Sequence, residues 1–222
     1  MREKHSKNKK DMGLASEICI WKKGADCEGC NLENEVICTP HVKYSVYFGL
    51  PLLIAIIPVI IGLVFAGFYN PLVLALIFTG WIAYSLFFFF IWESRIICNH
   101  CPYYANDTQR TLHCPVDKGK LKTSKYDPGP MRLSEKIQFV IGATIFALYP
   151  LPFLLIAGQI IPIIFLLGGV IIWIIVIQLT ICPYCVNFSC PLNRVPKSVR
   201  NEFLNLNPVI KKAWKEKGYV IE

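Results

Sequence analysis

The chain has 222 residues, of which 54% are hydrophobic and only 17% are charged, and its net charge is +8. Soluble domains carry about 25% charged residues, so the composition argues against a soluble globular protein. The charges also avoid two long stretches: no Asp, Glu, Lys or Arg lies between Lys43 and Glu93, or between Lys136 and Arg194. Each stretch is long enough to cross a bilayer twice, since one crossing needs about 20 apolar residues. We therefore predict an all-α integral membrane protein with four transmembrane helices, arranged as two hairpins, and Cys-rich cytoplasmic segments.

The N-terminal segment, residues 1–43, is polar and rich in lysine, and it lacks the apolar region of a signal peptide. It carries four cysteines with the spacing C-x7-C-x2-C-x7-C: Cys19, Cys27, Cys30 and Cys38. Four thiolates suit a tetrahedral zinc ion or an iron–sulfur cluster. A loose, reduced Cys-rich tail is the alternative interpretation.

The first apolar stretch, residues 44–92, predicts a transmembrane hairpin with helices at 44–66 and 71–92. The apolar run pauses at residues 67–70, and Pro71 follows. Proline is well placed in a first helical turn, because its missing N–H has no partner there in any case.

The central loop, residues 93–136, carries three cysteines, Cys98, Cys101 and Cys114, and a basic stretch that ends in a turn at 127–130. The first two form a C-x2-C pair at the exit of the second helix. Proline follows Cys101 and Cys114, and a Cys-Pro step stiffens a ligand loop. His100 and His113 each precede a cysteine; solvated histidines are the prediction, and metal ligands the alternative.

The second apolar stretch, residues 137–181, predicts helices at 137–157 and 160–181, with a pause at Gly158 and Gln159. None of the four spans contains an ionisable residue or a histidine. Ion and proton pathways normally leave such residues in the membrane, so their absence argues against transport through the bundle, and the absence of histidine excludes a bis-histidine haem within the bilayer. A lipid or quinone between the helices needs few polar groups and stays open.

The C-terminal segment, residues 182–222, begins with Cys182, Cys185 and Cys190, again a C-x2-C pair at a helix exit. Two such pairs on neighbouring helix ends form a strong ligand pattern. Further on, Pro208 and Gly218 delimit a predicted amphipathic helix. This helix would lie on an anionic membrane surface or dock against the Cys-rich loops.

The three polar segments hold 8, 8 and 7 Lys and Arg residues, which are all 23 in the chain. Four crossings place these segments on one face, and an excess of Lys and Arg marks that face as cytoplasmic. The protein is thus expected in the cytoplasmic membrane with both termini in the cytoplasm. The positive charge then faces anionic lipid and does not indicate nucleic-acid binding.

All ten cysteines lie in these cytoplasmic segments, where thiols stay reduced, so their clusters predict metal or redox sites rather than disulfides. The six later cysteines suit one or two iron–sulfur clusters, for example of the 4Fe-4S type. Zinc is the alternative cofactor, and free dithiols are a third choice.

The leading functional hypothesis is a membrane-anchored iron–sulfur subunit for electron transfer, a redox part of a larger membrane complex. Its expected partners are the lipid bilayer and either other protein subunits or a soluble electron carrier. A zinc-stabilised assembly subunit of a membrane complex is one alternative. A membrane thiol-disulfide oxidoreductase is another, because Cys182-Pro183-Tyr184-Cys185 is similar to the glutaredoxin active site. That resemblance covers four residues only, and they follow a membrane helix rather than a βαβ unit.

Overall fold

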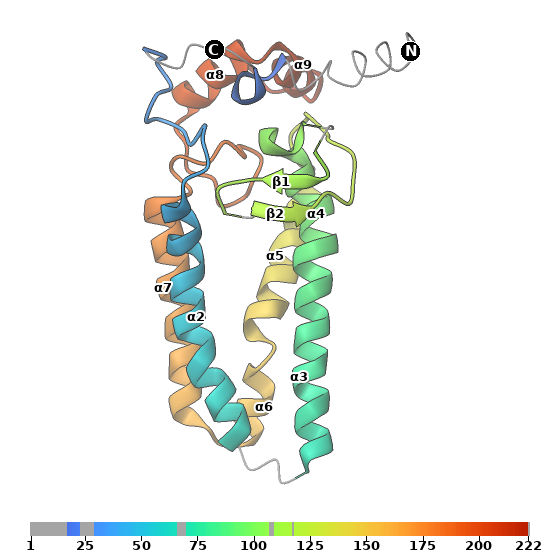
Figure 1. Cartoon of the computed structure of the whole chain (residues 1–222), viewed down its shortest axis with the longest axis vertical. Helices are drawn as coiled ribbons and strands as arrows, with labels where there is room; N and C mark the ends of the chain where they lie inside the picture. The colour runs from blue at the N-terminus through green and yellow to red at the C-terminus, as the bar shows by residue number, and fades with distance from the viewer. Residues whose placement is uncertain (1–16, 23–28, 66–69, 107–108, 117, 222) are drawn as a thin grey trace.

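The computed structural model describes residues 17–22, 29–65, 70–106, 109–116 and 118–221, and the protein is mostly helical (Figure 1). Four helices are long and apolar enough to cross a bilayer, at Val42–Phe65, Pro71–His100, Leu133–Ile156 and Ile160–Thr180. Within the described residues, these helices match the four predicted spans in number and approximate position. The elements are η2 (Cys19–Trp21), α2 (Val42–Phe65), α3 (Pro71–Leu86), η3 (Phe87–Trp92), α4 (Glu93–Ile96), η4 (Cys98–His100), η5 (Pro102–Tyr104), β1 (Thr111–His113), β2 (Lys118–Leu121), α5 (Leu133–Leu148), α6 (Leu151–Ile156), α7 (Ile160–Thr180), α8 (Lys197–Leu206) and α9 (Pro208–Glu216).

The second span begins where the sequence predicts but runs further. The side chain of Asn70 accepts a hydrogen bond from the Leu72 N–H at 2.9 Å, and Pro71 occupies the first turn. The helix then passes through the π-helical segment η3 into α4 and ends near His100 rather than at residue 92. Glu93 is accommodated in this extension because Lys120 pairs with it, at 2.6 Å between Nζ and Oε2.

Prolines affect the first and third spans differently. Helix α2 runs unbroken through Pro51 and Pro58. The third span is interrupted between Leu148 and Leu151, next to Pro150, and becomes α5 and α6. A proline inside a helix removes one backbone donor, and such breaks are tolerated in membranes where neighbouring helices satisfy the freed groups.

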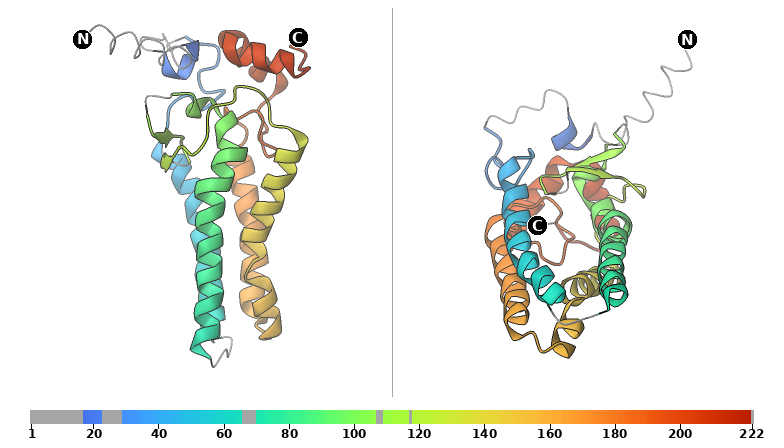
Figure 2. Two further views of the ribbon diagram at one scale, coloured as in Figure 1. Left: turned by 90° about the vertical axis from the view of Figure 1, so that its right-hand side faces the viewer. Right: turned by 60° about the horizontal axis from the view of Figure 1, so that its bottom comes forward.

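Helix packing does not follow the predicted hairpins. The most extensive contact joins the first span to the fourth, α2 to α7, and α3 with η3 and α4 packs on α5 (Figure 2). Small residues permit the first of these contacts, since a Cβ added at Gly169 would overlap Ala55 and one added at Gly62 would overlap Pro162. Close approach through small residues is typical of membrane helices.

Aromatic polar groups inside the bundle bond to backbone carbonyls on neighbouring helices. The indole N–H of Trp173 donates to the Phe48 carbonyl at 2.9 Å, and the Tyr84 hydroxyl donates to the Gly142 carbonyl at 2.9 Å. Each bond crosses between two spans, from α7 to α2 and from α3 to α5. They satisfy polar atoms that would otherwise be costly at membrane depth.

The described residues before α2, between α4 and α5, and after α7 gather at one end of the bundle, and we call them the cap (Figure 1). The cap contains a short antiparallel hairpin, β1 with β2, that the all-α prediction missed. Its strands have only three and four residues, too short for a clear alternating pattern.

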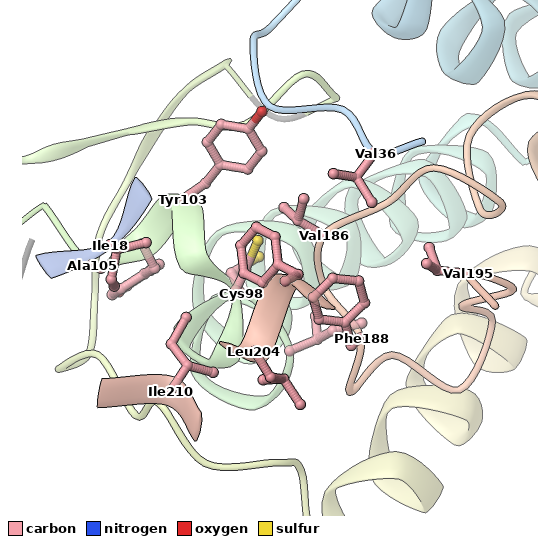
Figure 3. Close-up of a cluster of buried hydrophobic side chains, with 14 of the residues drawn as sticks. Ile18, Val36, Cys98, Tyr103, Ala105, Val186, Phe188, Val195, Leu204 and Ile210 are labelled. Carbon is pink, nitrogen blue, oxygen red and sulfur yellow. The ribbon is translucent and has the colours of Figure 1, made fainter. Parts of the chain in front are cut away.

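One hydrophobic core joins all three parts of the cap (Figure 3). Ile18 and Val36 come from the N-terminal segment, and Tyr103 from the central loop, while Phe203 and Trp214 come from α8 and α9. The described part of the N-terminal segment is therefore packed rather than a loose tail. Because Trp214 is only 5% exposed, the apolar face of α9 docks into the cap and does not lie on the membrane surface.

Candidate metal centre

A cavity of about 200 Å³ lies between the two helix pairs and extends to the cap. All six cysteines of the two C-x2-C segments line it: Cys98, Cys101, Cys114, Cys182, Cys185 and Cys190. The first two follow α4, the third follows β1, and the last three follow α7. The structure thus brings together, at one cavity, thiols that the sequence separates by more than 60 residues.

Burial is the main electrostatic feature of these thiols. Burial, followed by the neighbouring Cys185 thiol, raises the pKa of Cys182 to about 12. Burial also raises the pKa of Cys101 well above its usual value, with further increases from the nearby charges of Cys114, Cys185 and Cys190. The charges of Cys114, Cys185 and Cys190 thus act on the Cys101 thiol. Without a cation, such thiols are protonated at neutral pH.

Three of these four sulfurs accept a hydrogen bond from the backbone N–H two residues further along the chain. Tyr103 donates to Cys101, and Asn187 donates to Cys185, and each bond lowers the thiol pKa against the effect of burial. Leu192 donates to Cys190 at 3.4 Å. Proline directly follows Cys101 and Cys190. Because proline has no N–H and a fixed φ, the N–H of the next residue is the donor to the sulfur. Such bonds stabilise thiolates and tune cluster potentials.

A side-chain amide holds the C-terminal cysteine segment against the end of the second span, and further bonds close that segment on itself. The Asn187 amide donates to the carbonyl of Ile97, next to Cys98, at 2.9 Å. Asn193 donates to the Cys185 carbonyl at 2.6 Å, and the backbone of Arg194 donates to the Cys182 carbonyl at 3.0 Å. The bond from Asn187 to Ile97 therefore joins the two C-x2-C segments, and sequence spacing alone does not reveal it.

One residue of the N-terminal segment, Ile37, forms hydrogen bonds to both cysteine segments. The Ile37 carbonyl accepts from the Tyr103 hydroxyl at 2.9 Å, and the Ile37 N–H donates to the Tyr184 carbonyl at 2.7 Å. Tyr184 lies inside the second C-x2-C pair. Trp21 adds a third bond, from its indole N–H to the Pro102 carbonyl at 2.9 Å.

The N-terminal cysteines lie outside the lining of this cavity where the structure describes them. The Cys19 sulfur accepts a hydrogen bond from the Asn207 side-chain Nδ2 at 3.4 Å, and the Cys19 N–H donates to the Asn207 side-chain Oδ1 at 2.7 Å. Cys30 and Cys38 line a second pocket between the N-terminal segment and the top of α2. Cys27 lies outside the described residues, so the four-cysteine site remains a prediction.

His100 is buried, which corrects the prediction of a solvated histidine. Its Nδ1 lies 2.8 Å from the Gly129 carbonyl, and its Nε2 lies 3.6 Å from Glu135 at the start of α5. This histidine therefore ties the turn at 127–130 to the bundle. His113 is half-buried, with its Nδ1 3.3 Å from the Thr111 carbonyl and its ring edge-on to Trp21.

Three further polar residues near the thiols were missed by the sequence reasoning. Burial, with charge on Cys101 and other nearby cysteines, raises the pKa of Tyr103. Burial and charge on Cys101 also raise the pKa of Tyr126. Glu93 lines the cavity and is paired with Lys120. Of these three, only Tyr103 could have been identified from the sequence, because it lies two residues after a cysteine.

The donor set fits a thiolate-bound metal group in its chemistry. Six sulfurs, several of them supported by backbone N–H groups, surround one protected space. Within the described ranges, no three His, Cys, Asp or Glu side chains are already placed to hold a metal ion. Ligation would therefore require side-chain rotations around the cavity. No known protein family, curated protein or solved structure matches this chain.

Proposed function

We propose that this protein is a membrane-anchored redox subunit that holds an iron–sulfur cluster at the cysteine-lined end of its cavity. The observation that carries the proposal is that all six cysteines of the two C-x2-C segments line one cavity. Cys101, Cys114, Cys185 and Cys190 are the proposed ligands, because the charges of the last three raise the pKa of Cys101. A cluster bound there would accept and donate single electrons.

The chain's own residues would support such a cluster in three ways. The amides of Tyr103, Asn187 and Leu192 would donate to ligand sulfurs. The apolar surroundings would limit water access, and burial of this kind shifts the potential of an iron–sulfur group. The bonds from Ile37 to both segments would keep the ligand loops closed.

The cap is proposed to face the cytoplasm, since the three polar segments of the sequence, 1–43, 93–136 and 182–222, carry all 23 Lys and Arg residues. Exposed lysines on it include Lys118 and Lys125 near β2 and Lys212, Lys215 and Lys217 on and just after α9. A positive surface steers an acidic partner toward it. An acidic soluble electron carrier, or a partner subunit with an acidic face, is therefore the proposed partner at this end.

The pKa shifts weigh against thiol-disulfide exchange as the main function. The attacking group in that reaction is a thiolate, whereas burial raises the pKa of Cys182 to about 12 and also raises that of Cys185. A bound metal favours the thiolate form, so the same burial is compatible with ligation. Zinc would use the same sulfurs, and the experiment must separate it from iron.

Visible absorption of anaerobically purified protein tests the proposal. The wild type should be brown and show the broad visible absorption band typical of iron–sulfur proteins. Reduction with dithionite should bleach this band. Single Cys101→Ser, Cys114→Ser, Cys185→Ser and Cys190→Ser variants should lose most of this band. Cys30→Ser is the matched control, because Cys30 lines a different pocket, and it should keep the band. A colourless wild type with bound zinc would overturn the proposal and favour the assembly role.

A further inference from the structure

We propose that the membrane-embedded part of the cavity is a binding site for a lipid-soluble quinone, which binds more tightly in its reduced quinol form. The binding rests on the cavity itself. It does not depend on the metal of the proposed function above.

The walls of the cavity come from both helix pairs of the bundle. Phe48, Leu52 and Ala55 of α2 and Leu166, Val170 and Trp173 of α7 form one wall. Helices α3 and α5, together with η3, form the facing wall. Protein interiors normally leave few voids larger than a water molecule, and an apolar cavity binds apolar ligands rather than water. A space of this size between membrane helices therefore indicates an apolar ligand.

Several aromatic side chains in the lining favour a flat aromatic ligand. Trp81, Phe88 and Phe89 come from α3 and η3, and Phe139 and Phe146 from α5. Several of them contact one another, as Phe89 and Phe146 do with ring centroids 4.8 Å apart. Aromatic rings gain from offset or edge-on contacts with a further ring, which a quinone head group offers and a plain acyl chain does not.

At the cap end, one residue of the cavity lining carries a buried acceptor that lacks a partner in the part of the chain that the structure describes. Asn187 lines the cavity and is 7% exposed. Its Nδ2 donates to the Ile97 carbonyl, which fixes the orientation of the amide, while its Oδ1 has no hydrogen-bond partner among the described residues. Buried polar atoms are normally satisfied. A quinol hydroxyl would donate to this oxygen, whereas an oxidised quinone has no donor to offer.

The site thus combines an aromatic, apolar chamber at membrane depth with one acceptor at the boundary of the cap. The carboxylate of Glu93 also lines the cavity, but Lys120 pairs with it at 2.6 Å, so Asn187 Oδ1 is the proposed contact. Cys185, two residues before Asn187, lines the same cavity. A quinol head group bound to Asn187 would therefore lie at the cysteine-lined end.

Quenching of tryptophan fluorescence tests this proposal directly, because Trp81 and Trp173 line the cavity. The full-length protein in nanodiscs, kept anaerobic, is titrated with a short-chain naphthoquinone and, separately, with its quinol. Saturable quenching is expected, with the quinol about tenfold tighter. Ala143→Phe, which places a ring in the chamber, should weaken both ligands at least tenfold. Val140→Phe is the matched control on the same helix, since Val140 is 48% exposed toward lipid, and it should bind as the wild type does.

Two further variants separate this inference from the proposed function. Asn187→Ala should lose the preference for quinol over quinone while still binding both. The double variant Cys101→Ser with Cys185→Ser should keep quinol binding even if it has lost all metal. The proposal is overturned if quenching by the wild type does not saturate, or if Ala143→Phe binds like Val140→Phe. It is also overturned if a diacylglycerol displaces the quinol at equal concentration, because the site would then select a lipid alcohol.

Discussion

The cap and the bundle are both rich in apolar side chains, yet different forces hold them together. In the cap, three distant segments bury a shared core that includes Tyr104, Phe203 and Leu204, all at most 2% exposed. In the bundle, most large apolar side chains remain exposed at the surface, where lipid would contact them. The hydrophobic effect therefore drives association of the cap segments but not of the helices, which depend on close packing and interhelical hydrogen bonds.

The largest effect is expected from opening the core of the cap. Phe203 is fully buried on α8 and packs edge-on to Phe188, with ring centroids 5.1 Å apart. Phe203→Ala should lower the free energy of unfolding by about 3–5 kcal/mol, measured in urea by alkylation of the buried cysteines. Leu206→Ala on the same helix is the control, because Leu206 is 49% exposed, and it should cost less than about 0.5 kcal/mol.

Breaking the ion pair between the bundle and the cap should have the next largest effect. Lys120→Met leaves the carboxylate of Glu93 mostly buried, with 14% of its side chain exposed. The expected cost is about 3 kcal/mol, because an unpaired buried charge is strongly destabilising. The double variant Glu93→Gln with Lys120→Met should recover much of this stability in the same urea assay. If the double variant is as unstable as the single one, the pair is not what makes Lys120 important.

A smaller effect is expected at the contact between the first and fourth spans. Gly169→Ala places a methyl group against Ala55 and should cost about 1–3 kcal/mol, the usual range for overpacking. Gly168→Ala is the control, because a Cβ there meets open space, and it should be neutral or slightly stabilising. Unfolding of the reconstituted protein in SDS measures both. Equal losses in the two variants would contradict the packing of α2 on α7.

The smallest effect is expected from one interhelical hydrogen bond. Tyr84→Phe removes the hydroxyl that donates to the Gly142 carbonyl and should cost about 0.6 kcal/mol, the average for such bonds in a membrane. Tyr47→Phe, at a residue that is 42% exposed, is the control for the chemical change. A loss from Tyr84→Phe as large as that of Phe203→Ala would remove the distinction between bundle and cap.

The sequence predicts the bundle well because the bilayer imposes a simple rule. The charge-free stretches predict four spans. Pro71 begins α3 as expected, and Asn70 is the N-cap residue of that helix. The sequence does not predict the helix beyond residue 92, because a charged residue such as Glu93 indicates the end of a membrane span. The ion pair with Lys120, which the sequence does not reveal, accommodates Glu93 within the helix. The packing of α2 on α7 depends on facing small residues, which spacing along one helix does not reveal.

The candidate site was predictable only in part. The paired C-x2-C motifs at helix exits indicated that the six cysteines meet, and they line one cavity. The sequence could not show the orientation of the Asn187 amide, because it is set by a hydrogen bond to the Ile97 carbonyl, 90 residues away. It also could not show the hydrogen bond from Tyr103 to the Ile37 carbonyl, which joins two distant segments. The role of Cys-Pro was anticipated as a stiff loop, whereas its consequence, an amide aimed at the sulfur, depends on local geometry.

Metal and sulfide content of anaerobically purified protein tests the central claim most directly. The account predicts iron and acid-labile sulfide in equal amounts per chain, measured by mass spectrometry and colorimetry, with both lost in Cys185→Ser and both retained in Cys30→Ser. Zinc without iron or sulfide in the wild type would contradict it. Iron that persists unchanged in Cys185→Ser would also contradict it, by placing the metal away from the cysteine-lined cavity.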